Sequence, residues 1–344
     1  MESNPTKVPK VSESALQRAI KKERELARLH ELSVYERNEV GYINGRFIQS
    51  AFPYTDTGET KHTTRNGNLT ITIASVGEHG LPYGTYPRLV MIWLTMAVIS
   101  NSQKYDQDDP ERLKIHFGKN LAGFMKQLGI TPRYGKTVRK DGKIEVSSGA
   151  RLEEQMERLF NININIKELV EDDDGGTIET YNTLVSESLQ LRWSNKGGER
   201  GALYDSYVEL SPKFFNLLNT KRVPIDLGIL RQLKRSGLAL DIFVWLSFRV
   251  SYARAPFIVT TEDLMHQFAT RLNPGVAEDR RDFMAKFKRA VKKIHEAWPE
   301  SAKVNAAGNA RLQVREGGKG IIVYPFPNPS VPRRTPRKIR RAKV

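Results

Sequence analysis

One predicted helix near the end of the chain, residues 278–298, carries a dense group of basic side chains. They are Arg281, Lys286, Lys288, Arg289, Lys292 and Lys293. At about 100° per residue they lie opposite an apolar stripe that includes Phe283, Phe287 and Ile294. Such a helix suits the DNA major groove, where Arg can hold guanine O6 and N7 and Lys neutralises phosphate. The same pattern also fits an ordinary amphipathic surface helix with solvated lysines.

The segments on either side of this helix favour DNA contact. A turn at residues 273–275 precedes it, and a hairpin with the glycine-containing tip 316–319 follows it, which adds Lys319 to the expected contacts. From residue 329 onward the chain becomes almost purely basic, and we expect a disordered arm that follows phosphates. The expected contacts of this arm are Arg333, Arg334, Arg337 and Lys338.

The equivalent helix of the first half, residues 148–160, has a different charge. It holds three glutamates against Arg151 and Arg158, and an acidic face is poor for binding phosphate. The loop before it offers auxiliary DNA contacts at Arg133, Lys136, Arg139 and Lys140. Residues 251–344 hold 20 basic and 8 acidic residues, and thus 12 of the formal excess of 16 positive charges. We therefore expect the second half to carry most of the DNA affinity and the first half to serve self-association.

No residue pattern in the chain predicts catalysis, a cofactor or a metal. The absence of cysteine excludes disulfides, thiol catalysis and cysteine-based zinc sites. The six histidines are scattered, without metal-ligand spacing, and the acids at 106–109 and 171–174 look like loop residues. The string Gly135-Lys136-Thr137 resembles a phosphate-binding loop, but five residues separate Gly129 from Gly135 where that loop has four. We expect a protein that is not an enzyme.

The order of expected elements repeats along the chain. Helices at about 87–100, 120–128 and 148–160 precede extended segments at 162–170, 181–193 and 204–210. A second pass places helices at 212–218, 224–234, 236–253, 261–269 and 278–298, with short strands at 257–259, 303–306, 312–315 and 320–324. Both passes follow the order of a winged-helix domain, which is a helix-turn-helix with a β-hairpin. We predict an α+β fold with tandem winged-helix domains at 69–222 and 223–328.

Basic extensions flank these two domains. Residues 1–68 form an N-terminal arm with a helix at 12–32, either a partner helix or a basic arm on DNA, followed by a turn-rich connector at 33–68. Residues 329–344 form the basic tail. The N-terminus lacks an apolar signal segment, and the longest apolar run, 89–99, is too short to span a bilayer. We expect a cytoplasmic protein without a membrane partner.

A specific string near the start of the first domain carries a family resemblance. Gly80-Leu-Pro-Tyr-Gly-Thr-Tyr-Pro-Arg88, followed by Leu89-Val-Met-Ile-Trp-Leu94, resembles plasmid-encoded RepA replication initiators. Segments 117–129, 151–160, 207–214, 224–226 and 239–251 are similar to the same family. The resemblance implies a protein that recognises directly repeated sites, called iterons, at a plasmid origin. It also implies duplex opening, recruitment of host helicase and initiator proteins, and a homodimer in equilibrium with monomer that limits copy number.

Two other readings stay open at this point. A winged-helix transcriptional regulator would bind DNA without initiating replication, although a repressor usually needs only one such domain per protomer. A DNA-processing enzyme would need a metal or nucleophile site, which the sequence does not reveal.

Overall fold

The computed structural model of the chain describes residues 39–47, 52–118, 120–133, 137–138, 144–172, 175–191 and 206–330. The helix expected at 12–32 lies outside these ranges, and so does most of the basic tail. The predicted contacts that fall outside are Lys136, Arg139, Lys140, Arg333, Arg334, Arg337 and Lys338. The described part mixes helices with small antiparallel sheets, which confirms the α+β class.

The first half is built around a long apolar helix, α2 (Tyr86–Lys104). Pro87 lies in its first turn, where the missing N–H costs nothing, and buried side chains surround the helix on nearly all sides. The short elements that follow are η2 (Pro110–Arg112), β4 (Lys114–His116), α3 (Leu121–Gln127), β5 (Thr137–Val138), β6 (Ile144–Glu145) and α4 (Ser148–Phe160). Asn120 and Ser147 cap α3 and α4 by accepting backbone N–H groups with their side chains. These helices lie where the sequence predicts them.

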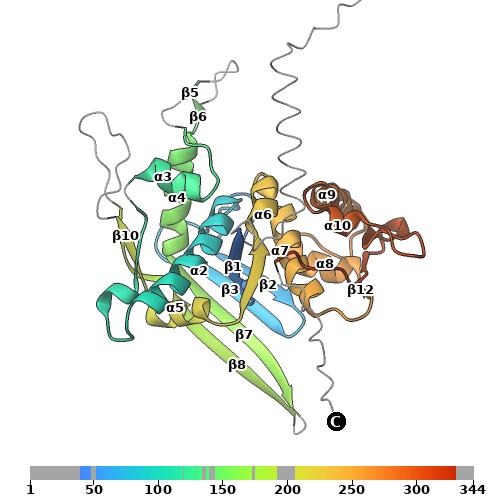
Figure 1. The fold of residues 1–344 in the computed structure, drawn as a ribbon, viewed down its shortest axis with the longest axis horizontal. Helices are drawn as coiled ribbons and strands as arrows, with labels where there is room; N and C mark the ends of the chain where they lie inside the picture. The colour runs from blue at the N-terminus through green and yellow to red at the C-terminus, as the bar shows by residue number, and fades with distance from the viewer. Residues whose placement is uncertain are drawn as a thin grey trace, which may run out of the picture.

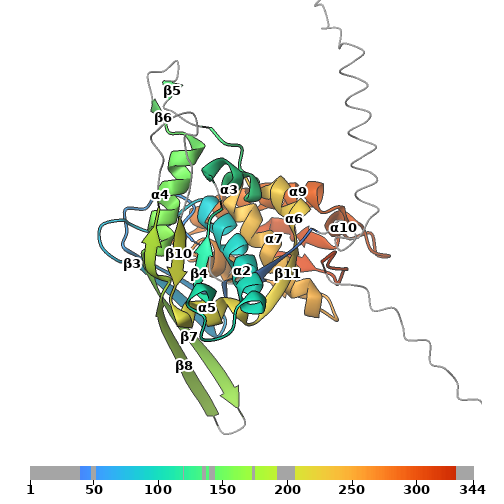
Figure 2. The same cartoon turned by 60° about the vertical axis from the view of Figure 1, so that its left-hand side comes forward.

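A four-stranded antiparallel sheet carries alternating apolar residues on its inner face. Its order is β2 (Lys61–Asn66), β3 (Leu69–Ser75), β7 (Ile162–Asp172) and β8 (Gly175–Leu184). Ile71 pairs with Ile166 and Ile73 with Ile164, and all four side chains are buried. A second sheet has the order β4, β10 (Tyr207–Leu210) and β9 (Ser186–Gln190). In Figures 1 and 2 the β7–β8 hairpin projects from the lower side of the molecule, whereas α3, α6 and α9 lie along the upper side.

Three strands, β1 (Val40–Asn44), β2 and β11 (Arg222–Asp226), differ from the sequence prediction. The segment 33–68, expected to be a connector, contains β1 and β2. The sequence of β2 is polar and only its Thr64 is buried, so it lacks the alternation of apolar and polar residues that predicts a strand. The helix expected at 224–234 begins only at α6 (Leu227–Leu233), because β11 pairs with β1. Asp226 ends this strand and caps α6, accepting from the amide groups of Gly228 and Ile229 at 2.7 and 3.0 Å. The predicted domain boundary at residue 222 falls at the start of β11, which pairs with a strand of the N-terminal segment. The boundary itself stays a prediction.

The second half follows α5 (Pro212–Asn219) and α6. It comprises α7 (Gly237–Tyr252), β12 (Phe257–Val259), α8 (Thr261–Phe268), α9 (Ala277–Ala297), α10 (Pro299–Ala302), β13 (Leu312–Val314), η3 (Glu316–Gly318) and β14 (Ile321–Val323). The three strands form a sheet with the order β12, β14 and β13. The strand expected at 303–306 is reduced to a single bridge between Val304 and Ala310. Gly320 allows the close sheet contact, because a Cβ there would lie 2.1 Å from the Val259 carbonyl oxygen.

A buried ion pair joins the two halves. The Arg88 guanidinium of α2 donates to both carboxylate oxygens of Asp241 on α7, at 2.7 and 2.8 Å. Arg88 also donates to the backbone oxygens of Phe52 and Gly84, and its guanidinium carbon lies 4.8 Å from the ring centre of Tyr54. The apolar core runs through both halves. The two halves are therefore packed firmly against each other.

Candidate nucleic-acid interface

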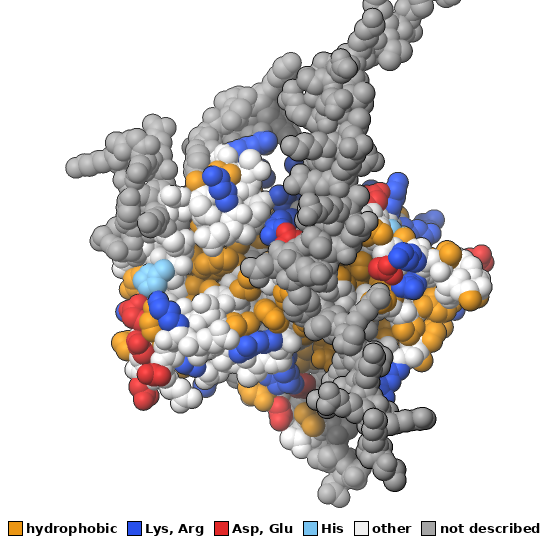
Figure 3. All heavy atoms as spheres, viewed as in Figure 1, with side chains coloured by type: hydrophobic (Ala, Val, Ile, Leu, Met, Phe, Trp, Pro, Cys, Tyr) orange, Lys and Arg blue, Asp and Glu red, His pale blue; other side chains and the backbone are white. Residues whose placement is uncertain are grey.

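Helix α9 presents its basic side chains to solvent. Its buried stripe includes Phe283, Phe287 and Ile294, which anchors the helix on α6, α7 and α8. All six basic residues predicted from the sequence are exposed, and the structure gives none of them an ion pair with any described residue. Figure 3 shows Lys and Arg side chains, with a few acids between them, over the part of the surface where Figure 1 places α9. Within the part of the chain that the structure describes, these six charges are therefore not neutralised by carboxylates.

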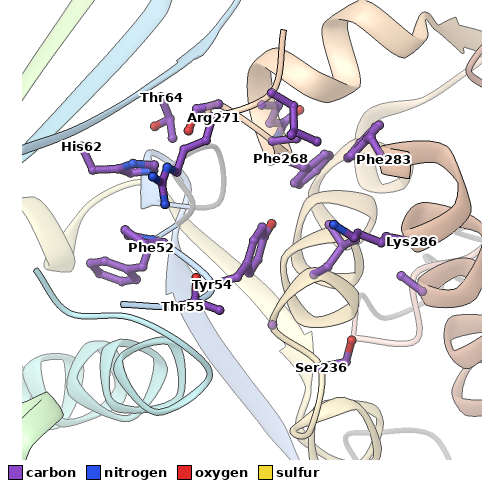
Figure 4. Close-up of a pocket in the computed structure, with 18 of the residues that line it drawn as sticks. Phe52, Tyr54, Thr55, His62, Thr64, Ser236, Phe268, Arg271, Phe283 and Lys286 are labelled. Atoms are coloured by element: carbon purple, nitrogen blue, oxygen red, sulfur yellow. The ribbon is translucent and has the colours of Figure 1, made fainter. Parts of the chain in front are cut away.

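The six cations of α9 form two rows along the helix. The inner row, Lys286, Arg289 and Lys293, lines a cavity of about 560 Å³ between the two halves. The outer row, Arg281, Lys288 and Lys292, lies on the arc that faces away from this cavity. Figure 4 shows Lys286 across the cavity from Tyr54 and His62. The two rows therefore have different surroundings, since the inner row lines the cavity and the outer row faces solvent.

The hairpin tip next to α9 is held in a fixed position. Gly317 and Gly318 adopt positive φ angles of 66° and 69°, which glycine accepts without strain. The Thr261 hydroxyl of α8 donates to the Gly318 carbonyl at 2.5 Å, and Arg315 donates to the Lys319 carbonyl at 3.3 Å. The Lys319 side chain is exposed beside this anchored turn.

Helix α4 of the first half uses its basic residues differently. Arg158 forms ion pairs with Asp56 and Glu154, each at 2.9 Å, and donates to the Leu81 carbonyl at 3.1 Å. These carboxylates raise the pKa of Arg158 although partial burial, the largest single influence, lowers it. Burial, followed by the charge of Glu157, raises the pKa of Glu153. The charge of Arg158 is thus balanced by carboxylates of the protein itself.

A second basic surface lies at the N-terminal end of α4. Arg133, one of the predicted auxiliary contacts, lines a pocket of about 510 Å³ together with Arg151, Lys234 and Arg235. Lys234 has one of its three hydrogen-bond donors in use, because its ammonium group donates to the Gly129 carbonyl. The sequence prediction missed Lys234 and Arg235, because they lie about 100 residues beyond Arg133 in the chain. Only the fold brings these side chains together.

The string Gly80–Arg88 is a structural junction. Gly80 and Gly84 have positive φ angles of 72° and 75°, and the Tyr83 amide donates to Gln155 of α4 at 2.7 Å. The guanidinium of Arg158 lies 5.0 Å from the ring centre of Tyr83. Arg88 then continues the junction to α7. The string thus fixes α2 against elements of both halves, a role that its sequence alone did not indicate.

Burial gives this junction unusual acid–base properties. The pKa of Tyr54 is raised well above its ordinary value, first by burial and then by the charge of Asp241. The pKa of Arg88 is raised by Asp241 although burial, the largest single influence, opposes this. The Arg88 guanidinium therefore stays charged within the core.

The structure shows no candidate metal site within the described ranges, where no three His, Asp or Glu side chains form a metal-binding group. Among the same residues, no helix combines the length and apolar character needed to cross a membrane.

Comparison with known families identifies the chain at this point. The family model described as plasmid-encoded RepA protein matches residues 81–256, just over half of the 344 residues. The chain belongs to the family of plasmid-encoded RepA proteins. The resemblance predicted from Gly80–Arg88 is thereby confirmed. The RepA match includes both Arg88 and Asp241, and it ends before α9 begins.

Two solved structures of domains 2 and 3 of RctB are similar to the chain. The selenomethionine derivative has 14% sequence identity and a TM-score of 0.45, and the alignment covers 80% of this chain and 94% of that one. The other has 11% identity and a TM-score of 0.44, with coverage of 82% and 97%. A search of the curated proteins found no match.

Proposed function

We propose that this RepA-family protein initiates plasmid replication by binding directly repeated duplex sites at the origin. It then helps to open the duplex and recruits host helicase and initiator proteins. The observation that carries the proposal is the exposed face of α9, where six cations have no ion-pair partner among the described residues. Such a face attracts a polyanion and releases condensed counterions on binding.

The arrangement of elements supports a pair of winged-helix domains. In the second half α7, β12, α8 and α9 precede the β13–β14 hairpin, with the sheet order β12, β14, β13. In the first half α2, β4, α3 and α4 precede β9 and β10, with the equivalent order β4, β10, β9. The β7–β8 hairpin is an insertion in this scheme. We assign α9 as the recognition helix and the β13–β14 hairpin as the wing.

The proposed contacts follow from this assignment. The outer row enters the major groove, and Lys319 at the wing tip reaches a flanking phosphate. The basic surface around Arg133 and Arg151 makes an auxiliary phosphate contact, to which the sequence prediction adds Lys136, Arg139 and Lys140. The tail cations beyond residue 331 add affinity without specificity.

Self-association is assigned to the β8 edge of the four-stranded sheet. β8 has no neighbour on its outer side among the described strands, and its Ile178 is 68% exposed and its Tyr181 41% exposed. An exposed apolar edge strand is a template for pairing with another chain. Ile178→Asp should shift the homodimer toward monomer in sedimentation. Ile258→Asp, at an exposed isoleucine of β12, is the matched control and should leave the dimer fraction unchanged. An unchanged dimer fraction in Ile178→Asp would exclude this edge.

In this proposal the protein acts by binding and distorting the duplex, without covalent chemistry or a cofactor. It acts in the cytoplasm and needs no membrane. A plasmid that carries this gene and its flanking repeats, introduced into cells without another initiator, tests the proposal. We expect autonomous replication. Specific binding to the repeats without replication would favour the alternative, a transcriptional regulator. Nicking of supercoiled DNA with magnesium would favour an enzyme.

A further inference from the structure

The cavity beside the inner row brings together segments that lie far apart in the sequence. The first half contributes residues 52–57, His62 and Thr64, and the second half contributes the start of α7, residues 267–272 and α9. Figure 4 shows Phe52 and Tyr54 on one side, with Phe268 and Phe283 across from them. The volume of about 560 Å³ falls in the range of small-ligand sites.

The described Lys, Arg, Asp and Glu residues that line this cavity are all basic. The described residues that line it include four cations, Arg271, Lys286, Arg289 and Lys293, and no Asp or Glu. Arg271 has a distant ion-pair partner, Glu59 at 3.9 Å, and the inner row has none among the described residues. Cations around a mostly apolar space favour a ligand that combines an anionic group with an apolar body.

An unused hydrogen-bond donor lies in the wall of the same cavity. Gln267 is 4% exposed, and its Nε2 is shielded from solvent and has no hydrogen-bond partner. Leaving a buried amide unpaired costs free energy, and a rotation of this side chain toward the cavity would let a ligand with an acceptor recover it. A nucleobase offers both apolar faces and hydrogen-bond acceptors on its edge.

We propose that this cavity binds one unpaired nucleotide, with its base against the apolar walls and its phosphate on the inner row. The proposal rests on the proposed function, because it assigns the opened strand of the origin as one source of the nucleotide. A free mononucleotide offers the same chemistry and is the other source. Aromatic and apolar contact with the base, combined with cations for the backbone, is how proteins hold single-stranded nucleic acid.

Paired variants of one helix test the proposal in the full chain. Lys286→Gln with Lys293→Gln removes two inner cations, and Lys288→Gln with Lys292→Gln removes two outer cations of the same type and exposure. Thr270→Trp, at an exposed position of the cavity lining, narrows the cavity without changing charge. The probes are a short oligothymidylate with one 2-aminopurine, free dAMP as competitor, and a duplex of the origin repeats.

We expect the inner pair and Thr270→Trp to weaken oligonucleotide binding by about tenfold or more and to abolish the 2-aminopurine signal. The outer pair should weaken duplex binding more than oligonucleotide binding. Displacement by dAMP would assign the site to free nucleotides, and intact binding without displacement would assign it to the strand. Equal losses in both pairs, or normal oligonucleotide binding by Thr270→Trp, would overturn the proposal. Duplex binding without any binding of the oligonucleotide or of dAMP would contradict this inference and would still be consistent with the proposed function.

Discussion

The equivalent helices of the two halves, α4 and α9, differ in how Arg158 of the one and the basic face of the other are paired. On α4, Arg158 is held by two carboxylates and a backbone carbonyl. On α9, six basic side chains point to solvent without an ion-pair partner among the described residues. A paired cation has already lost its counterions, so it gains little from a phosphate. From this difference we expect that the pairing of basic residues, more than their number, decides which helix binds DNA.

The largest expected effect concerns the most buried cation of the first half. Arg88→Met leaves Asp241 without its partner in the core, and we expect the free energy of unfolding to fall by about 3–5 kcal/mol. Urea denaturation measures this change. The double variant Arg88→Met with Asp241→Asn should recover part of the loss. A stability near that of the wild type in Arg88→Met would show that this pair does not join the two halves.

The second effect concerns the unpaired cations of the outer row. Arg281→Ala with Lys288→Ala and Lys292→Ala should weaken binding to origin duplex on the order of 100-fold, at roughly 1 kcal/mol or more per side chain. The salt dependence of affinity should flatten by about 0.9 in slope for each lost phosphate contact. Titrations at several salt concentrations measure both quantities.

A matched control removes the same charge from another face. Lys61, Arg65 and Lys167 are exposed on the four-stranded sheet, and register places them on one side of it. Their replacement by Ala should change duplex affinity only slightly. An equal loss in both triple variants would mean that net charge, and not α9, determines binding.

A third, smaller effect separates stability from binding. Arg158→Met should lower the free energy of unfolding by about 1–2 kcal/mol, since it breaks two ion pairs and a hydrogen bond. Duplex affinity of the folded variant should stay within about twofold of the wild type. A clear loss of DNA affinity would show that this arginine exchanges its partners for phosphate, and the contrast between the two helices would weaken.

The smallest effect comes from His295, an ionisable side chain of α9 that contacts a neighbouring strand. His295 contacts the Leu312 carbonyl of β13 at 3.1 Å, and burial lowers its pKa although this hydrogen bond opposes the shift. The unfolded chain therefore takes up the proton first, so stability falls as pH drops below about 6.5. His295→Gln should remove this part of the pH dependence, which melting temperatures measured above and below about pH 6.5 would show. A larger dependence in the variant would contradict the assignment.

Local patterns predicted much of this fold. The helices expected at 148–160, 212–218, 261–269 and 278–298 are observed as α4, α5, α8 and α9. In the structure Ser147, Ser211 and Thr260 cap the first three of them. The α6 prediction was wrong at its start because pairing with β1, about 180 residues away, holds 222–226 in a strand. Periodicity within a segment cannot reveal a partner at that distance.

The candidate site was predictable only in part. The basic face of α9 could be read from helical spacing, because all its residues belong to one element. Its division into two rows depends on the first half, which supplies Tyr54 and His62 to the cavity. The surface around Arg133 and Lys234, and the pair of Arg88 with Asp241, likewise join distant segments. No local pattern encodes such contacts.

Cleavage of DNA from a single engineered cysteine tests the central claim most directly. The natural chain contains no cysteine, and Ala285 is exposed on α9 among the outer-row cations, so Ala285→Cys can carry a DNA-cleaving reagent without loss of charge. The control is Thr180→Cys on the β7–β8 hairpin, which projects from the opposite side. We predict strand cleavage within the origin repeats from position 285 and none from position 180. Equal cleavage from both positions, or none from position 285, would contradict the assignment of α9 as the helix that binds origin DNA.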